Sequence, residues 1–176
     1  MLRESLAPRM DPPSAVTVRC QEAERIDPSK LPEMMADKYW AVRLKVAQRI
    51  DPSLLPGMMG DLSWQVRQMV AKRIDPSRLP KMMVDQDWAV RREVARRIDP
   101  SRLPEMMWDK SLFVRCEVAE RISIDQLHEM LWNHELVLRE VAKRIPHRFL
   151  SYMIMVTKDQ EIIGTLKDRI TYGDMK

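Results

Sequence analysis

Cysteine and glycine are scarce in this chain, which has two cysteines, four glycines and twelve prolines among 176 residues. Cys20 and Cys116 each follow a Val-Arg pair at the same place of a repeated segment, four repeats apart. A disulfide requires Cα atoms within about 7 Å, whereas repeats stacked at about 10 Å would hold these cysteines tens of Å apart. We therefore expect free thiols and a reducing compartment. The excess of proline over glycine predicts short, stiff connections.

Long apolar runs and strand patterns are also missing. The first residues, MLRES, are followed by no stretch that is long and apolar enough for a signal peptide or a membrane span. No run alternates apolar and polar residues with a period of two, so no β-strand is predicted. The composition, 45% hydrophobic and 32% charged, is typical of a folded globular protein. These features predict one soluble, cytoplasmic domain over residues 1–176, with no membrane partner.

Charge is distributed unevenly along the chain, although the net charge is only +4. Residues 67–102 contain ten Lys or Arg against five Asp or Glu, and residues 103–140 contain four against eight. A surface polarised in this way can guide a charged partner, but mixed surface charge also serves solubility alone.

A segment of 24 residues recurs through most of the chain. Residues 85–102 read DQDWAVRREVARRIDPSR, and similar segments stand 24 residues before and after them. A period of this length is typical of stacked-repeat proteins. We predict residues 1–17 as an N-terminal cap, 18–145 as regular repeats and 146–176 as a divergent C-terminal capping repeat. About seven units are counted from the isoleucines that end them: Ile26, Ile50, Ile74, Ile98, Ile122, Ile145 and Ile170.

Each unit is predicted to contain a long helix followed by a short one. Val42, Val46 and Ile50 recur at the spacing of one helical face, and Asp37 stands where an N-cap is expected. An Asp-Pro pair then ends the long helix, because proline lacks a backbone donor and disfavours helix at the residue before it. The same pair is a good start for the next helix. The segment after this pair is short and rich in proline, which favours a 3-10 helix.

The combined pattern D-x-x-W-x-V-R-x-x-V-A-x-R-I-D-P-S-x-L-P-x-M-M resembles the leucine-rich repeat variant family over residues 5–170. Its Asp and Val-Arg part is also similar to HEAT-type repeats. The resemblance implies an all-α fold, a right-handed solenoid of alternating α and short 3-10 helices. The best-known family member looks like an iron–sulfur protein with a cysteine cluster before its repeats. Residues 1–17 contain no cysteine, so we expect no cofactor and no metal.

Two columns of side chains are predicted to hold the repeats together. A double column of methionines falls at inward apolar positions and is expected to pack in the core rather than to bind a partner or a soft metal. Aspartates that precede arginines by six residues are expected to form a structural ladder between neighbouring repeats, since arginine offers a fork of five donors. The ladder comprises Asp37, Arg43, Asp61, Arg67, Asp85, Arg91, Asp109 and Arg115.

A second arginine stands directly before each isoleucine, and most of these arginines have an aspartate two residues on. In the stretch 67–102 the basic charges exceed what such local pairs would neutralise. The alternative function that we consider is therefore binding to a nucleic-acid backbone, which would be nonspecific and salt-dependent; a solvated helix face is the simpler interpretation. The residues concerned are Arg73, Arg78, Lys81, Arg92, Arg96 and Arg97.

Tryptophans form two further columns. Trp40, Trp64 and Trp88 stand at predicted helix starts and are expected to cover them. Trp108 and Trp132 occupy a position that holds alanine, glycine or valine in earlier units, so we expect it to be partly exposed. This pair is the aromatic candidate for a partner site.

No feature of the sequence indicates catalysis. There is no Gly-rich phosphate loop, no nucleophile elbow and no metal-ligand spacing around the three histidines. Every candidate catalytic residue type belongs to a periodic column, whereas a catalytic site normally breaks the period. We therefore predict a non-catalytic scaffold that binds another protein or peptide, and the oligomeric state stays open.

Overall fold

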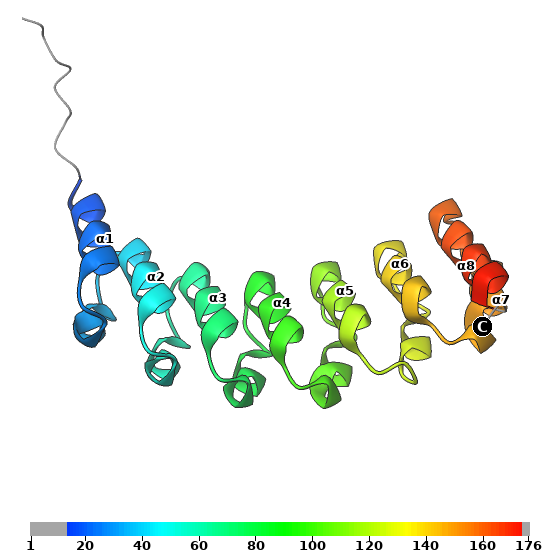
Figure 1. Ribbon diagram of the computed structural model, residues 1–176, viewed down its shortest axis with the longest axis horizontal. Coiled ribbons are helices and arrows are strands. Elements are labelled where there is room, and N and C mark those ends of the chain that lie inside the picture. Colours follow the sequence, from blue (N-terminus) through cyan, green and yellow to red (C-terminus); the bar gives the residue numbers. More distant parts are fainter. Residues whose placement is uncertain (1–13, 174–176) are drawn as a thin grey trace, which may run out of the picture.

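The computed structural model describes residues 14–173 as an arc of stacked helical repeats, with the long helices on its inner side and the short ones on its outer side (Figure 1). The long helices are α1 (Ala15–Arg25), α2 (Trp40–Arg49), α3 (Trp64–Arg73), α4 (Trp88–Arg97), α5 (Leu112–Arg121), α6 (Glu135–Arg144) and α8 (Gln160–Gly173), with a shorter α7 (Leu150–Val156) before the last. The 3-10 helices between them are η1 (Pro28–Met34), η2 (Pro52–Met58), η3 (Pro76–Met82), η4 (Pro100–Met106), η5 (Leu127–Met130) and η6 (His147–Phe149). Residues 14–173 contain no strand. The predicted all-α solenoid of alternating α and 3-10 helices is confirmed.

The first four 3-10 helices begin at the predicted Asp-Pro pairs. Asp51, for example, is the N-cap of η2, and its carboxylate accepts the backbone N–H of Ser53 at 2.8 Å. The hydrogen bonds from Ser53 also hold the pKa of Asp51 below its ordinary value. Where Ser-Ile replaces Asp-Pro, η5 keeps only four residues. Asp-Pro therefore sets the length of the short helix.

The starts of the long helices differ from the prediction in two places. Asp37 is not an N-cap, because α2 begins at Trp40 with Tyr39 as its cap; Asp37 instead accepts the Tyr39 N–H at 2.9 Å in the turn before the helix. Ser14 caps α1, so that residues 15–17, which the sequence placed in the N-terminal cap, form its first turn. The rest of that predicted cap lies outside the described residues.

The core is one continuous cluster that runs through the stack. Val46, Ile50, Leu55 and Met58 of one unit are almost fully buried, and their equivalents in the following units are buried as well. The prediction that the methionines pack in the core is confirmed for the first methionine of each described unit, whereas the second is only partly buried at Met35, Met59 and Met83. Each long helix packs against the next, and α8 closes the C-terminal end on α6 and α7. The repeats thus hold every surface column in a fixed order along the arc.

Candidate partner-binding surface

The arginines of the ladder join neighbouring repeats. Arg43 donates to both carboxylate oxygens of Asp61 in the next repeat, at 2.6 and 2.8 Å, and also to the carbonyl of Asp37 in its own repeat at 2.7 Å. Burial alone would raise the pKa of Asp61, but the bonds from Arg43 and from a backbone N–H outweigh it, and the pKa is lowered. The same arrangement joins Arg67 to Asp85 and Arg91 to Asp109. These side chains connect repeats and are not free to bind a partner.

The ladder changes at the junction between α5 and α6. Arg115 meets Asn133 instead of an aspartate, with its Nε 2.7 Å from the amide oxygen. The amide nitrogen of Asn133 is buried and has no hydrogen-bond partner among the described residues. Beyond this junction the next bridge is made by Arg139, which binds Asp159 at 2.8 Å.

The second arginine row has a structural role that the sequence interpretation missed. Arg73 donates to the carbonyls of Ala47 and Ile50, at 2.7 and 3.0 Å, and so completes the C-terminal end of the preceding helix α2. Arg97 does the same for α3, through Ala71 and Ile74. Further members of the row that cap the preceding long helix are Arg49, Arg121, Arg144 and Arg169. The guanidinium groups of Arg73 and Arg97 are thus used inside the fold, which removes the reason for assigning them to a partner.

The aspartates expected to neutralise this row bind elsewhere. Asp99, two residues after Arg97, accepts from the backbone and hydroxyl of Ser101. The bonds from Ser101 are also the main cause of its lowered pKa, and Arg121 of the next repeat adds a smaller part. A 24-residue period reveals the columns but not which neighbouring repeat supplies the partner.

Two of the other predicted basic residues are paired as well. Arg92 and Arg96 both donate to the carboxylate of Glu117 on the next helix, each at 3.1 Å. The Glu117 side chain is only 5% exposed, whereas those of Arg92 and Arg96 are 44% and 51% exposed. One carboxylate neutralises only one of the two guanidinium groups, so a positive charge remains at this site. The 24-residue period did not reveal this contact, because Glu117 lies in the repeat that follows Arg92 and Arg96.

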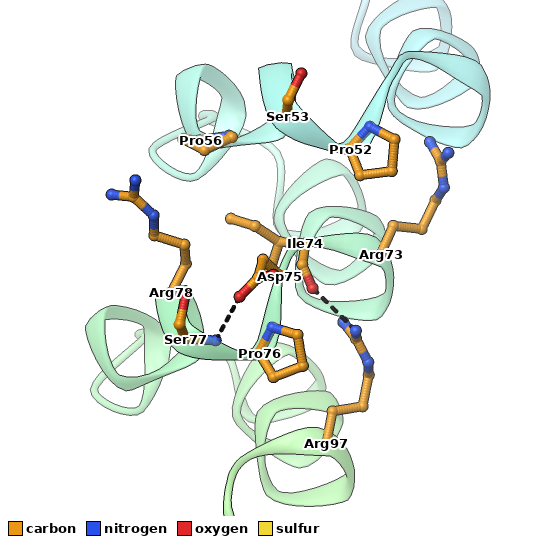
Figure 2. Close-up of a pocket in the computed structure, with 10 residues that line it drawn as sticks. All are labelled: Pro52, Ser53, Pro56, Arg73, Ile74, Asp75, Pro76, Ser77, Arg78 and Arg97. Carbon is orange, nitrogen blue, oxygen red and sulfur yellow. Dashed lines mark hydrogen bonds between the residues drawn. The ribbon is translucent and has the colours of Figure 1, made fainter.

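Arg78 and Lys81 are exposed on η3, and neither makes an ion pair within residues 14–173. Figure 2 shows Arg78 and Arg73 on opposite sides of a groove between two Asp-Pro turns. An equivalent groove lies one repeat later, lined by Pro76, Arg97 and Arg121. The structure thus brings Arg73, Arg78 and Arg97 to the same groove (Figure 2), whereas Arg92 and Arg96 lie on the face of α4 beside Glu117.

Large apolar side chains do gather in one row. Trp108 and Trp132 are 61% and 74% exposed, each two residues after a buried methionine. At the same place in other units, Val84 is 87% and Met155 is 83% exposed. The ring of Tyr152 meets Trp132 edge-on at 6.3 Å. The sequence singled out the two tryptophans; the buried-methionine position could also have revealed Met155.

The tryptophans at the helix starts are less enclosed than expected. Trp40, Trp64 and Trp88 are 41–47% exposed, so they cover the first turn with one side only. Trp88 packs against Phe113 of the next repeat at 5.0 Å. This second row adds to the apolar surface near the loops.

Shallow clefts lie beside the row in the first half of the arc. One of about 480 Å³ includes Ala36, and one of about 440 Å³ lies between Gly60 and Val84. A smaller one, of about 280 Å³, lies between Val84 and Trp108. The row therefore combines projecting side chains with recesses.

Groups suited to a metal or to a membrane span are not found in residues 14–173. No cluster of three metal-ligating side chains occurs there. His134 caps α6 through a bond from the Leu136 N–H, and His128 stacks on Phe149. No helix in this part of the chain has the length and apolar character needed to cross a membrane.

Comparison with known proteins finds similarity to a solved structure. No protein-family model and no curated protein matches the sequence. A solved structure described as "a leucine-rich repeat variant with a novel repetitive protein structural motif" matches with 31% sequence identity and a TM-score of 0.83. The match covers 89% of this chain and 67% of that chain. It extends over almost all of the repeats described above.

Proposed function

Because this chain belongs to the leucine-rich repeat variant family, we propose that it is a non-catalytic scaffold that binds another protein or peptide. The observation that carries the proposal is the exposed row of Val84, Trp108, Trp132 and Met155, which we call the apolar row. Large apolar side chains exposed at one repeated position are costly in water and commonly mark an interaction site. Tryptophan is also among the residues that contribute most to binding energy.

The polar groups of the repeats support the same choice by exclusion. Both arginine columns are bonded within the fold, and Glu117 holds Arg92 and Arg96. Four of the six predicted basic residues are therefore engaged within the fold, which makes nucleic-acid binding the weaker alternative. The free thiols of Cys20 and Cys116 support a cytoplasmic location.

The proposal is tested by affinity capture from cell extract with wild-type chain and with the double variant Trp108→Ala/Trp132→Ala. We expect captured proteins to fall at least about tenfold with the variant, as truncation of aromatic anchors commonly costs more than 1.4 kcal/mol. The matched control is Trp40→Ala/Trp64→Ala, which removes the same side chains from the helix-start column. Equal capture by all three chains would contradict a role for the apolar row.

A second measurement addresses nucleic acid. Fluorescence anisotropy of labelled RNA and DNA at two salt concentrations should show no saturable binding at physiological salt. Salt-sensitive binding that is lost in Arg78→Glu/Lys81→Glu would support the nucleic-acid alternative instead.

A further inference from the structure

The position of the apolar row recurs in six repeats, two residues after the buried methionine of each unit, and its side chains change in size along the arc. Before the four residues of the row, this position holds Ala36 and Gly60. The first three are small and the last three are large, and all six are exposed. The first half of this series of positions therefore leaves room at the surface, whereas large side chains project from the second half.

The recesses lie on the small half. The clefts at Ala36 and between Gly60 and Val84 are open to solvent and bordered by the ladder. A Cβ atom added to Gly60 would meet no other atom within 4 Å. A large side chain from another molecule could rest on the surface at this position without displacing the chain's own atoms.

The charge next to the row changes sign between Val84 and Trp108. Lys81 stands three residues before Val84, and Glu105 stands three residues before Trp108. Both side chains are exposed, and Glu105 is held by Arg102 of its own repeat.

We propose that the partner of the apolar row is a second copy of this chain, packed antiparallel about a two-fold axis between Val84 and Trp108. The inference rests on the proposed function, since it assigns a partner to the same row. Rotation about this axis reverses the row. It places Trp108 of one copy over Val84 of the other, and Trp132 over Gly60. Met155 then faces Ala36, and Lys81 faces Glu105.

A two-fold interface requires a surface that complements itself after rotation. Here the reversed order of sizes matches three large residues to three small ones. The rotation also places Lys81 of each copy against Glu105 of the other, and these two opposite-charge contacts favour association at low salt.

Sedimentation velocity or light scattering of the wild-type chain tests this proposal. We expect a mass twice the 20.8 kDa of the chain, with dissociation as salt is added. Trp108→Ala/Trp132→Ala should raise the dissociation constant at least about tenfold. A wild-type chain that remains monomeric at about 100 µM would overturn the proposal.

Charge reversal gives a sharper arm. Lys81→Glu and Glu105→Lys should each be monomeric, because each brings like charges together twice about the axis. An equimolar mixture of the two variants should dimerise, because in the mixed dimer both contacts pair a lysine with a glutamate. Variants that dimerise alone as tightly as wild type, or a mixture that stays monomeric, would overturn the axis.

Size exchange gives an independent arm. Gly60→Trp should dissociate the dimer by filling the space of Trp132, and Gly60→Trp/Trp132→Gly should restore it by exchanging the sizes. The matched control is Gly164→Trp on α8, where an added Cβ also meets nothing within 4 Å. This control should remain dimeric, and circular dichroism should show all variants folded. Dimerisation of Gly60→Trp at wild-type strength would contradict the predicted contact.

The outcomes separate this inference from the proposed function. A monomeric wild type that still captures another protein through Trp108 and Trp132 would overturn the second copy as partner and leave the scaffold function standing. A dimer that captures no other protein through the row would support the inference and overturn binding of an unrelated protein there.

Discussion

At the scale of single residues, arginine connects the repeats because its planar fork can serve several acceptors at once. Arg43 bridges a carboxylate of the next repeat and a carbonyl of its own. Lysine has three donors on one nitrogen and cannot match this planar fork. Asn133 interrupts this chemistry, since its amide nitrogen is buried opposite Arg115 without an acceptor among the described residues.

Asn133→Asp should therefore stabilise the protein. The new carboxylate would restore the two-oxygen acceptor found at the other junctions and remove the unpaired amide nitrogen. We expect an increase of about 1 kcal/mol in the free energy of unfolding, because the gain is partly offset by burying a charge. Urea unfolding at pH 7 measures it, and a lower midpoint than wild type would contradict the argument.

At the scale of elements, the two kinds of helix are completed differently. The 3-10 helices carry their own cap, since an aspartate directly before the proline accepts the N–H of the residue after the proline. The long helices depend on the following repeat, whose arginine takes the last free carbonyls. A helix end has orphan carbonyls that need such donors.

Arg97→Ala should test this dependence. It would leave the carbonyls of Ala71 and Ile74 without their charged donor, and we expect a loss of about 2 kcal/mol in the free energy of unfolding. The matched control is Arg25→Ala, because Arg25 holds the same place in α1, the first helix described, and is exposed. Chemical unfolding should show little change for this control; equal losses in both variants would argue against capping.

These elements also show how much of the structure can be predicted from a single sequence. The period predicted where the long helices end, the methionine core and the 3-10 helices, because each depends on residues within one unit. The acceptors of Arg73 lie in the preceding unit, and Glu117 reaches Arg92 from the following one. Such contacts depend on how the units are displaced as they stack, which a period alone does not contain. For the same reason the exposure of Trp108 was predicted from its variable position, but the recess beside Gly60 was not.

At the scale of the whole molecule, the repeated ion pairs make the stability of the fold depend on pH. The pKa values of Asp61 and Asp85 are lowered, since bonds from arginine and from a backbone N–H outweigh the effect of burial. A carboxyl group with a lowered folded pKa contributes stability that is present above its unfolded pKa, about 3.9. That stability is lost as the pH falls through the folded pKa.

We expect the urea midpoint to be nearly constant from about pH 7 to pH 5 and to fall below about pH 4. Asp61→Asn should be less stable than wild type at neutral pH, because it removes one charged bridge. The two midpoints should converge as the pH falls and the wild-type carboxyl is protonated. Midpoints that stay equally far apart from pH 7 to the acid limit would show that Asp61 contributes through shape alone.

The arginine that reaches back to the preceding helix also bears on how such a protein can change its length over evolution. Each unit supplies one arginine, which donates to the preceding unit, and one pair of carbonyls, which accept from the following unit. A duplication of 24 residues within the regular stack would therefore create a junction whose hydrogen-bonding groups are already matched. The junction also tolerates a change of one residue, since Arg144 and Arg169 stand 23 and 25 residues after the preceding arginine of the row and still donate to the preceding helix. Proteins of this fold can thus gain or lose whole repeats when the gene segment that encodes one repeat is duplicated or deleted.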